Sequence, residues 1–277
     1  MNAIEIEEVI KRAIDEDIGS GDITTENIIE GDKKGEGVMI AKEKGVVAGL
    51  EVAEKVFEMI DKSLKFEAKK DDGEEVKKGE ILAVIRGDIE SILKAERLAL
   101  NFLQRMSGIA TKTRRYVDKV RGYDVRVTDT RKTTPTLRYF EKWAVRLGGG
   151  HNHRMGLYDA VLIKDNHIKS AGGIGEAIGR ILEKIPHTTK IEVEVESISG
   201  VKEALKNKAD IIMLDNMSLE IMEKSVELIG DSAVTEASGG ITLENIEEVA
   251  KTGVDVISVG ALTHHIESID IGLDIKN

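Results

Sequence analysis

Two basic residues stand side by side where a short apolar segment ends. Arg131 and Lys132 follow VRVTD (125–129), and a pattern with helical spacing begins a few residues later. Arginine presents a planar fork of N–H groups that grips a carboxylate or a phosphate with two hydrogen bonds. The chain as a whole is acidic, with a formal net charge of -11, so this local reversal of charge predicts a site for an anion.

Further cationic side chains follow between residues 129 and 164. Arg154 and Lys164 also fall at the expected ends of strands or loops. Several such cations at the opening of one binding site would predict a ligand with more than one anionic group. Three other cations recur at helical spacing and are expected on a solvated helix face: Arg138, Lys142 and Arg146.

The segment KIEVEVES places Glu192, Glu194 and Glu196 on one face of a strand. Three carboxylates inside a packed interior would be costly without partners, so an edge strand with a solvated face is the simple interpretation. In a barrel, however, the last of the three carboxylates can reach the mouth and meet Mg²⁺ or a sugar. Glu194, together with Asp215 at the end of the next strand, would there hold a divalent cation such as Mg²⁺.

Glycine-rich connections carry two further signals. GGGHNHRMG (148–156) contains two histidines, but a metal site needs a third ligand, so structural or anion-contacting histidines are the favoured interpretation. SGG (238–240) and SVGAL (258–262) follow the last two expected strands, where a barrel often builds a phosphate cradle from backbone N–H groups.

The second half of the chain alternates apolar strand-like runs with amphipathic helical runs, which predicts βαβ units and a parallel sheet. The expected strands are 125–129, 160–164, 190–196, 211–215, 233–238 and 256–260, and the expected helices lie near 136–147, 174–185, 199–207, 218–229 and 243–251. Reactive polar residues end nearly every strand. That distribution favours an α/β barrel over an open sheet, which gathers its site at one switch point.

The first part of the chain mixes strands and helices without strict alternation, so α+β is the expected class. Helical spacing runs from Ile89 to Val120, with a break expected near Gly108. DDGEEVKKGEILAVI (71–85) has the pattern of a lipoyl- or biotinyl-type carrier hairpin. Because no convincing lysine for modification lies nearby, we interpret it as a structural hairpin.

Composition narrows the functional classes. The acidic balance argues against nucleic-acid binding and against anionic membranes. The absence of cysteine excludes disulfides, zinc–thiolate sites and a thiol nucleophile. No apolar run approaches the roughly 20 residues that a spanning helix needs, and the acidic N-terminus does not fit a signal peptide. A soluble, cytoplasmic protein is the expectation.

Several motifs occur together, in order and at characteristic spacing. They are ERLALNFLQRMSGIAT, TRKTTPTLR, KWAVRLGGGHNHRMGLYDAVLIKDNHI, EVEVES, IIMLDN, EASGGI and ISVGALTH. In these segments the chain resembles the quinolinate phosphoribosyltransferase family, also called nicotinate-nucleotide pyrophosphorylase (carboxylating). The resemblance covers most of the chain and is densest from 95 to 262. One departure is Thr136, where we expect glycine in many members of the family, and we expect only a local effect.

The resemblance implies an N-terminal sandwich domain over 1–107, joined by the C-terminal tail 266–277, and an incomplete parallel α/β barrel over 108–265. It implies a homodimer, with a hexamer of dimers as a larger option. The implied reaction converts quinolinate and phosphoribosyl pyrophosphate, with Mg²⁺, into nicotinate mononucleotide, pyrophosphate and CO₂.

The resemblance also assigns roles to residues. Arg131, His153, Arg154 and Lys164 would hold quinolinate beside Thr130, and Arg97 would reach in from the partner subunit. Lys132 would contact the pyrophosphate donor and ease departure of its leaving group. Glu194 and Asp215 would bind ribose hydroxyls, directly or through Mg²⁺. The 5′-phosphate would lie on two turns, which comprise Ser238, Gly239 and Gly240, and Val259, Gly260 and Ala261.

Other functions fit parts of the sequence. A molybdate-transport-associated branch of the family would share the site but differ in substrate. Nicotinate phosphoribosyltransferase would need to grip only one carboxylate. A Schiff-base aldolase would use Lys164 or Lys132 as its nucleophile. A carrier protein would require a modified lysine.

Overall fold

The computed structural model describes residues 3–29, 31 and 33–276. The chain divides into two compact units, each assembled from separate segments. The first comprises Met1–Arg114, Thr134–Gly149 and His265–Asn277, and the second comprises Arg115–Thr133 and Gly150–His264. The expected domain boundary after residue 107 stays a prediction. In the present division, the helix around 138–147 belongs to the first unit.

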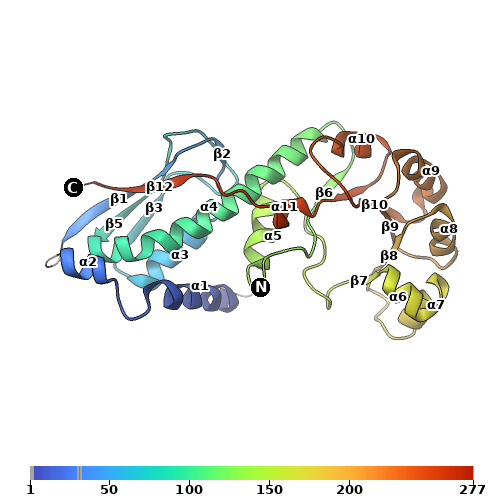
Figure 1. Cartoon of the computed structure of the whole chain (residues 1–277), viewed down its shortest axis with the longest axis horizontal. Coiled ribbons are helices and arrows are strands. Elements are labelled where there is room, and N and C mark those ends of the chain that lie inside the picture. Colours follow the sequence, from blue (N-terminus) through green and yellow to red (C-terminus); the bar gives the residue numbers. More distant parts are fainter. Residues whose placement is uncertain (1–2, 30, 32, 277) are drawn as a thin grey trace. The chain divides into compact units, whose positions relative to one another are not determined.

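The first unit is built on an antiparallel sheet whose strands come from both ends of the chain. The strand order is β12–β1–β5–β3, and a separate pair is formed by β2 and β4. The bounds are Lys34–Ala41 for β1, Gly45–Val46 for β2, Lys65–Ala68 for β3, Glu75–Val76 for β4, Ile81–Asp88 for β5 and Ile271–Lys276 for β12. Figure 1 shows β12, in red, beside the blue β1, and the register runs from Glu36 opposite Lys276 to Ala41 opposite Ile271.

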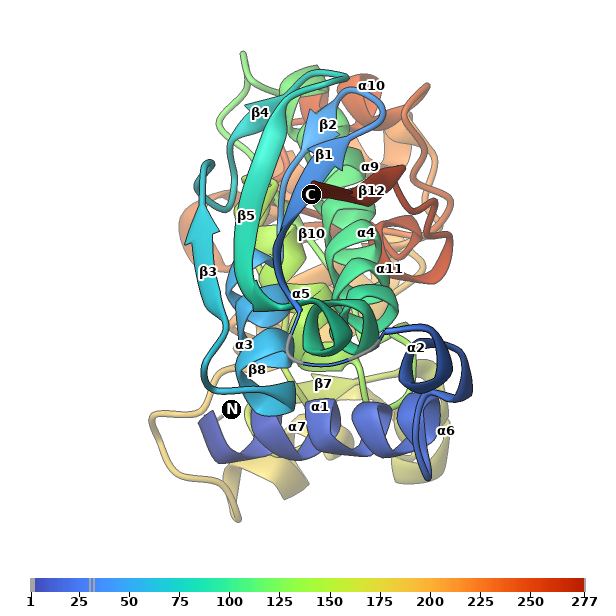
Figure 2. The same ribbon diagram turned by 90° about the vertical axis from the view of Figure 1, so that its left-hand side faces the viewer.

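Two helices of the first unit lie on one face of this sheet (Figure 2). They are α3 (Leu50–Ile60) and α4 (Ile89–Lys119), and the other helices of this unit are α1 (Ala3–Ile18), α2 (Ile23–Ile28) and α5 (Arg138–Leu147). Phe57 on α3 meets Phe66 on β3 with ring centroids 5.9 Å apart. Gly37 on β1 has no side chain, so Ile92 of α4 can pack against the strand.

The expected helix break at Gly108 is wrong, because α4 continues through it without interruption. A Cβ atom at this position would overlap the carbonyl oxygen of Glu267. The glycine therefore lets the main chain at Glu267 approach the helix closely. Glycine lowers the intrinsic stability of a helix, and this close contact explains why it is found here.

Two expectations for the segment before and within α5 are also wrong. The helix expected near 136–147 does not start at Thr136. It begins at Arg138, because Thr136 has a φ of +69°, which is not helical. Lys142 is only 1% exposed, so it does not belong to a solvated face, whereas Arg146 is exposed.

The second unit is a parallel six-stranded sheet wrapped by helices. Its order is β6–β11–β10–β9–β8–β7. The strands are β6 (Arg126–Thr128), β7 (Val161–Ile163), β8 (Ile191–Val195), β9 (Ile211–Asp215), β10 (Val234–Ser238) and β11 (Val256–Ser258). The helices are α6 (Asp165–Ala171), α7 (Ile174–Leu182), α8 (Ile198–Lys206), α9 (Leu219–Ile229), the 3₁₀ turn η1 (Gly230–Ser232), α10 (Ile246–Lys251) and α11 (Ala261–His264). Figure 1 shows α8 and α9 along the outer side of β8 and β9. All six predicted strands are confirmed.

The sheet forms an incomplete α/β barrel, as expected. β6 and β7 follow one another in sequence but occupy the two ends of the sheet and do not pair. An isolated bridge between Thr128 and His151 extends the β6 side instead. The interpretation of KIEVEVES as an edge strand is wrong, because β8 lies between β7 and β9. Glu192 is only 2% exposed.

Candidate active site

The carboxyl ends of the barrel strands open onto a cavity of about 560 Å³. Most of the residues predicted from the sequence line it. They come from the ends of five strands and the turns after them, and from the segment between α5 and β7. These residues are Thr130, Arg131, Lys132, His153, Arg154, Lys164, Glu194, Asp215, Ser238, Gly239 and Gly240. The structure thus brings these residues together at one cavity, and their roles stay predictions.

The backbone of Lys132 is held from two sides while its side chain remains exposed. Thr130 Oγ1 accepts the Lys132 N–H at 3.1 Å, and the buried hydroxyl of Thr263 donates to the Lys132 carbonyl at 2.8 Å. A Cβ atom on Gly260 would lie 3.2 Å from Lys132 Cδ, so this glycine leaves room for the lysine side chain. The lysine is thus anchored by its main chain, and its ammonium group can reach a ligand.

Arg154 is half-buried and its Nη1 donates to the Ala160 carbonyl at 3.1 Å. Burial lowers the pKa of its guanidinium, and the nearby charge of Arg131 lowers it further. Two like charges held close in a partly desolvated pocket are unfavourable until an anion arrives. The pair is therefore suited to bind negative charge.

Two carboxylates face the cavity from neighbouring strands. Glu194 Oε2 lies 2.7 Å from Lys164 Nζ, and Asp215 Oδ2 accepts from Asn216 Nδ2 at 2.6 Å. Oxygen donors of this kind suit Mg²⁺, which usually keeps several waters and takes further oxygens from substrate phosphates. The donor set therefore fits the implied ion.

The SGG turn requires its glycine. Gly239 has a φ of +90°, and a Cβ atom there would overlap the side-chain oxygen of Asn216. Asn216 donates its N–H to the Ser238 carbonyl at 2.9 Å and has a φ of +52° itself. The turn after β9 and the turn after β10 are consequently packed backbone to backbone at the opening of the cavity.

A buried cluster beneath these groups was missed as a site feature. His153 Nε2 lies 3.1 Å from Glu192 Oε2 and 3.6 Å from Glu236 Oε1, and both carboxylates are at most 3% exposed. Burial, together with the charge of Glu192, raises the pKa of Glu236 to about 7. The sequence signal was present in the alternation of KIEVEVES and in EASGG. A solvated strand face shows the same alternation, so the sequence alone does not reveal that Glu192 and Glu236 are buried.

Asp129 fixes the chain around this histidine. The Asp129 carboxylate accepts the His153 N–H at 2.9 Å and the Asn152 side-chain amide at 2.6 Å, and Asp129 itself is fully buried. Ligand-type atoms of His153, Glu192 and Glu236 lie within 4.8 Å of one another. However, His153 Nδ1 accepts the Arg154 N–H at 2.7 Å, so the proton of a neutral ring sits on Nε2 and blocks metal ligation there.

Four predicted residues do not line the cavity. Arg97 lies on α4 in the first unit, where it is exposed, and its only described electrostatic neighbour is the adjacent Glu96. Val259, Gly260 and Ala261 lie at the end of β11 and the start of α11, next to Lys132 through the contact of Gly260.

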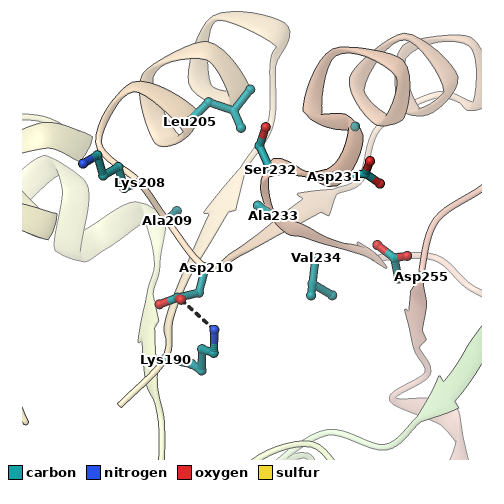
Figure 3. A pocket seen from close by; sticks show the side chains of 11 residues that line it. Lys190, Leu205, Lys208, Ala209, Asp210, Asp231, Ser232, Ala233, Val234 and Asp255 are labelled. Carbon is teal, nitrogen blue, oxygen red and sulfur yellow. Dashed lines mark hydrogen bonds and ion pairs between the residues drawn. The ribbon is translucent and has the colours of Figure 1, made fainter. Parts of the chain in front are cut away.

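A larger cavity of about 680 Å³ lies at the opposite end of the strands (Figure 3). Three of its charged groups have partners within the chain. Lys190 Nζ meets Asp210 at 2.8 Å, and Asp255 accepts from the N–H and the hydroxyl of Thr235 at 2.7 Å. Polar groups at the N-terminal end of barrel strands typically stabilise the fold. We therefore assign function to the smaller cavity.

Within the described ranges, no helix combines the length and the apolar character needed to cross a membrane.

The comparisons with known proteins agree with this geometry. Models of the N-terminal and C-terminal domains of quinolinate phosphoribosyl transferase match residues 22–107 and 109–274. A probable nicotinate-nucleotide pyrophosphorylase (carboxylating) of Bacillus subtilis is 42% identical, over 99% of this chain and 95% of the relative. A quinolinate phosphoribosyltransferase (decarboxylating) of Nicotiana tabacum is 44% identical, over 96% and 81%.

Solved structures give the same result. The crystal structure of NadC from Streptococcus pyogenes superposes with a TM-score of 0.95 at 41% identity, over 100% of this chain and 99% of the other. A nicotinate-nucleotide pyrophosphorylase from Francisella tularensis has the same TM-score at 39% identity, over 100% and 98%. With both of its domains matched and full-length relatives above 40% identity, the chain belongs to the quinolinate phosphoribosyltransferase family.

Proposed function

We propose that this protein is a decarboxylating quinolinate phosphoribosyltransferase of NAD biosynthesis. It converts quinolinate and phosphoribosyl pyrophosphate to nicotinate mononucleotide, pyrophosphate and CO₂. The observation that carries the proposal is the set of four cationic side chains on one cavity that also holds two strand-end carboxylates and a glycine turn. The cations are Arg131, Lys132, Arg154 and Lys164. Both substrates are polyanions, so the charge of the cavity matches them.

Quinolinate binding is assigned to three of the cations that line the cavity together with His153. Arg131, Arg154 and Lys164 meet its two carboxylates, with His153 and Thr130 beside them. The lowered pKa of Arg154 supports this role, because a guanidinium that is destabilised by burial and by Arg131 gains most from an incoming carboxylate. On binding, Lys164 exchanges Glu194 for the substrate.

Glycosyl transfer is assigned to Lys132, Glu194 and Asp215. The ring nitrogen of quinolinate forms a bond to C1 of the ribose as the bond from C1 to pyrophosphate breaks. Positive charge develops on the ribose, and the two carboxylates stabilise it, while Lys132 neutralises the departing pyrophosphate. The 5′-phosphate lies on the 238–240 turn and beside 259–261.

Mg²⁺ would be held by Glu194 and Asp215 together with oxygens of the substrate. When bound, the ion neutralises pyrophosphate charge and so supports its departure. The residues of the chain remain responsible for orienting the two substrates, which is the larger part of the task.

Decarboxylation follows from the charge of the product ring. Once its nitrogen is quaternary, the ring accepts the electron pair of the breaking C–C bond. The carboxylate next to the nitrogen leaves as CO₂, and a proton replaces it. The protein needs to release that carboxylate while it keeps its grip on the second one, which a divided set of cations permits.

We also propose that the enzyme acts as a homodimer in which Arg97 contacts quinolinate bound to the partner, with a hexamer of dimers as a larger assembly. The exposed position of Arg97 on α4 supports this role. A cytoplasmic location completes the proposal, and cell fractionation tests it.

The test is a paired assay with Mg²⁺ and phosphoribosyl pyrophosphate. One reaction receives quinolinate and the other receives nicotinate, and both CO₂ and mononucleotide are measured. Product and CO₂ from quinolinate alone are expected. Turnover of nicotinate alone would contradict the proposal. Absence of product from both would shift the assignment to the molybdate-associated branch with a different substrate.

A further inference from the structure

We propose that Glu192 and Glu236 are positioning residues that hold the imidazole of His153 in one tautomer and one orientation at the floor of the cavity. The inference rests on the proposed contact between His153 and quinolinate. The two carboxylates lie on β8 and β10, which flank β9. Inward side chains of alternate barrel strands share one layer, so both glutamates can address the same ring.

The hydrogen bonds of the ring determine its tautomer. Nδ1 of His153 accepts the Arg154 N–H at 2.7 Å and therefore carries no proton. A neutral imidazole then has its proton on Nε2. Nε2 lies 3.1 Å from one oxygen of Glu192 and 3.3 Å from the other, so the ring donates to this carboxylate. An acceptor-only group behind a histidine is the usual device for fixing tautomer and orientation.

Burial makes this arrangement specific. Glu192 is 2% exposed and would be costly without a donor, and the imidazole N–H is that donor. Glu236 is 3% exposed, and its Oε1 has no hydrogen-bond partner among the described residues. Two negative charges facing one neutral ring would repel each other, and the raised pKa of Glu236 fits a cluster that keeps a single negative charge.

Because of these contacts, the histidine does not offer a ring nitrogen to the substrate. Both ring nitrogens are engaged within the protein, so His153 presents carbon atoms and its ring face to the cavity that it lines. It packs against the pyridine ring of quinolinate, while the arginines and lysines bind the carboxylates. Glu192, which does not line the cavity, thus acts through the histidine, whereas Glu236 lies 3.6 Å from the same ring nitrogen and also lines the cavity.

The first experiment reads the tautomer directly. Protein labelled with ¹⁵N in histidine gives a long-range ¹H–¹⁵N spectrum, in which the His153 signals are assigned by their loss in His153→Gln. The expected pattern is that of an Nε2–H ring at pH 7. In Glu192→Ala the Nε2 signal should shift because its acceptor is lost, while Nδ1 still accepts the Arg154 N–H. An Nδ1–H ring or a rapid mixture in the unmodified protein would overturn the inference, whatever the kinetics show.

The second experiment separates positioning from general stability. Glu192→Ala is expected to raise the KM for quinolinate by about 10- to 100-fold, the usual range for an orienting residue, and to leave the KM for phosphoribosyl pyrophosphate within about threefold. Glu192→Gln retains an acceptor oxygen, so it should recover most of the loss. Glu236→Ala should show the same split between substrates, with partial recovery in Glu236→Gln. Glu227→Gln, an exposed position on α9 away from the cavity lining, is the matched control.

The outcomes of this series are distinguishable. Unchanged quinolinate KM in Glu192→Ala and Glu236→Ala would remove the inference. If His153→Ala also leaves that KM unchanged, the proposed contact between histidine and quinolinate fails as well. Should Glu192→Ala not fold, as judged by circular dichroism, Glu192→Gln and the tautomer spectrum of the unmodified protein still decide the question.

Discussion

At the scale of single residues, the site combines anchored backbones with free side-chain ends. Lys132 is the clearest case, since Thr130 and Thr263 hold its main chain while its ammonium group stays exposed. Removing the side chain therefore leaves the anchoring bonds in place. Effects of such a substitution on turnover can be separated from effects on folding.

Lys132→Ala should lower kcat by about 10²- to 10³-fold, because the charge that develops on pyrophosphate loses its partner. Circular dichroism and the melting temperature should stay unchanged. Lys169→Ala, which removes only an exposed ion pair with Asp165, is the control and should keep full turnover. Near-normal turnover of Lys132→Ala would remove this lysine from the mechanism.

Glu236 makes the free energy of unfolding depend on pH in the direction opposite to that of most carboxylates. Its pKa is raised from 4.5 to about 7 in the folded chain, so folding takes up a proton between these values. The contribution of this group to the free energy of unfolding is therefore largest at low pH and falls as pH rises from about 4.5 to about 7. The full loss is on the order of 3 kcal/mol, since the shift of about 2.5 pKa units corresponds to 1.36 kcal/mol for each unit.

Glu236→Gln removes this titration. Urea unfolding at pH 5 and at pH 7.5 should show the variant gaining stability relative to the parent as pH rises, by about 2 kcal/mol. Parallel pH profiles for the two proteins would show that Glu236 has an ordinary pKa in the folded state.

At the scale of elements, the strands of the barrel were predictable because each is a short apolar run that ends in reactive polar residues. The burial of Glu192 was not, since alternating glutamate and valine fit a solvated face as well as an inward face lined by a histidine. The sequence pattern also did not predict that α4 is uninterrupted. Gly108 resembles a helix break, and only the close approach of Glu267 explains it.

Thr136 is an element-scale feature that the sequence identified and the backbone explains. A β-branched residue at a φ of +69° is strained by roughly 1–2 kcal/mol, whereas glycine adopts this conformation freely. Glycine also gains more entropy in the unfolded chain, which offsets part of the benefit. The exposed turn before α5 therefore favours glycine at this position.

Thr136→Gly should raise the free energy of unfolding by up to about 1 kcal/mol, measured by urea denaturation. Ser63→Gly, in a turn of the same unit where φ is not positive, should lower it instead. Destabilisation by both substitutions would show that the strain at Thr136 is relieved in solution.

At the scale of the whole molecule, the predicted residues are divided between two units. The cavity and its cations belong to the second, whereas Arg97 belongs to the first. In an isologous dimer, each site could draw on the first unit of the partner, which makes Arg97 testable by subunit mixing.

Arg97→Ala should weaken quinolinate binding. When it is reassembled with an equal amount of Lys132→Ala, half of the dimers are mixed, and each mixed dimer has one site with both residues. Activity should then recover to about a quarter of that of the unmodified enzyme. Failure to recover in mixtures whose subunit exchange is verified by mass would place Arg97 in its own subunit's site or in the fold.

The pairing of β12 with β1 has a consequence for biosynthesis on the ribosome. β12 is translated after every strand of the barrel, yet it covers the edge of a strand made near the beginning of the chain. During translation that edge of β1 remains open to other nascent chains, and the first sheet closes only after the barrel sequence has emerged. Early termination within the barrel would therefore release a chain prone to aggregation, because its first unit still exposes an unpaired strand.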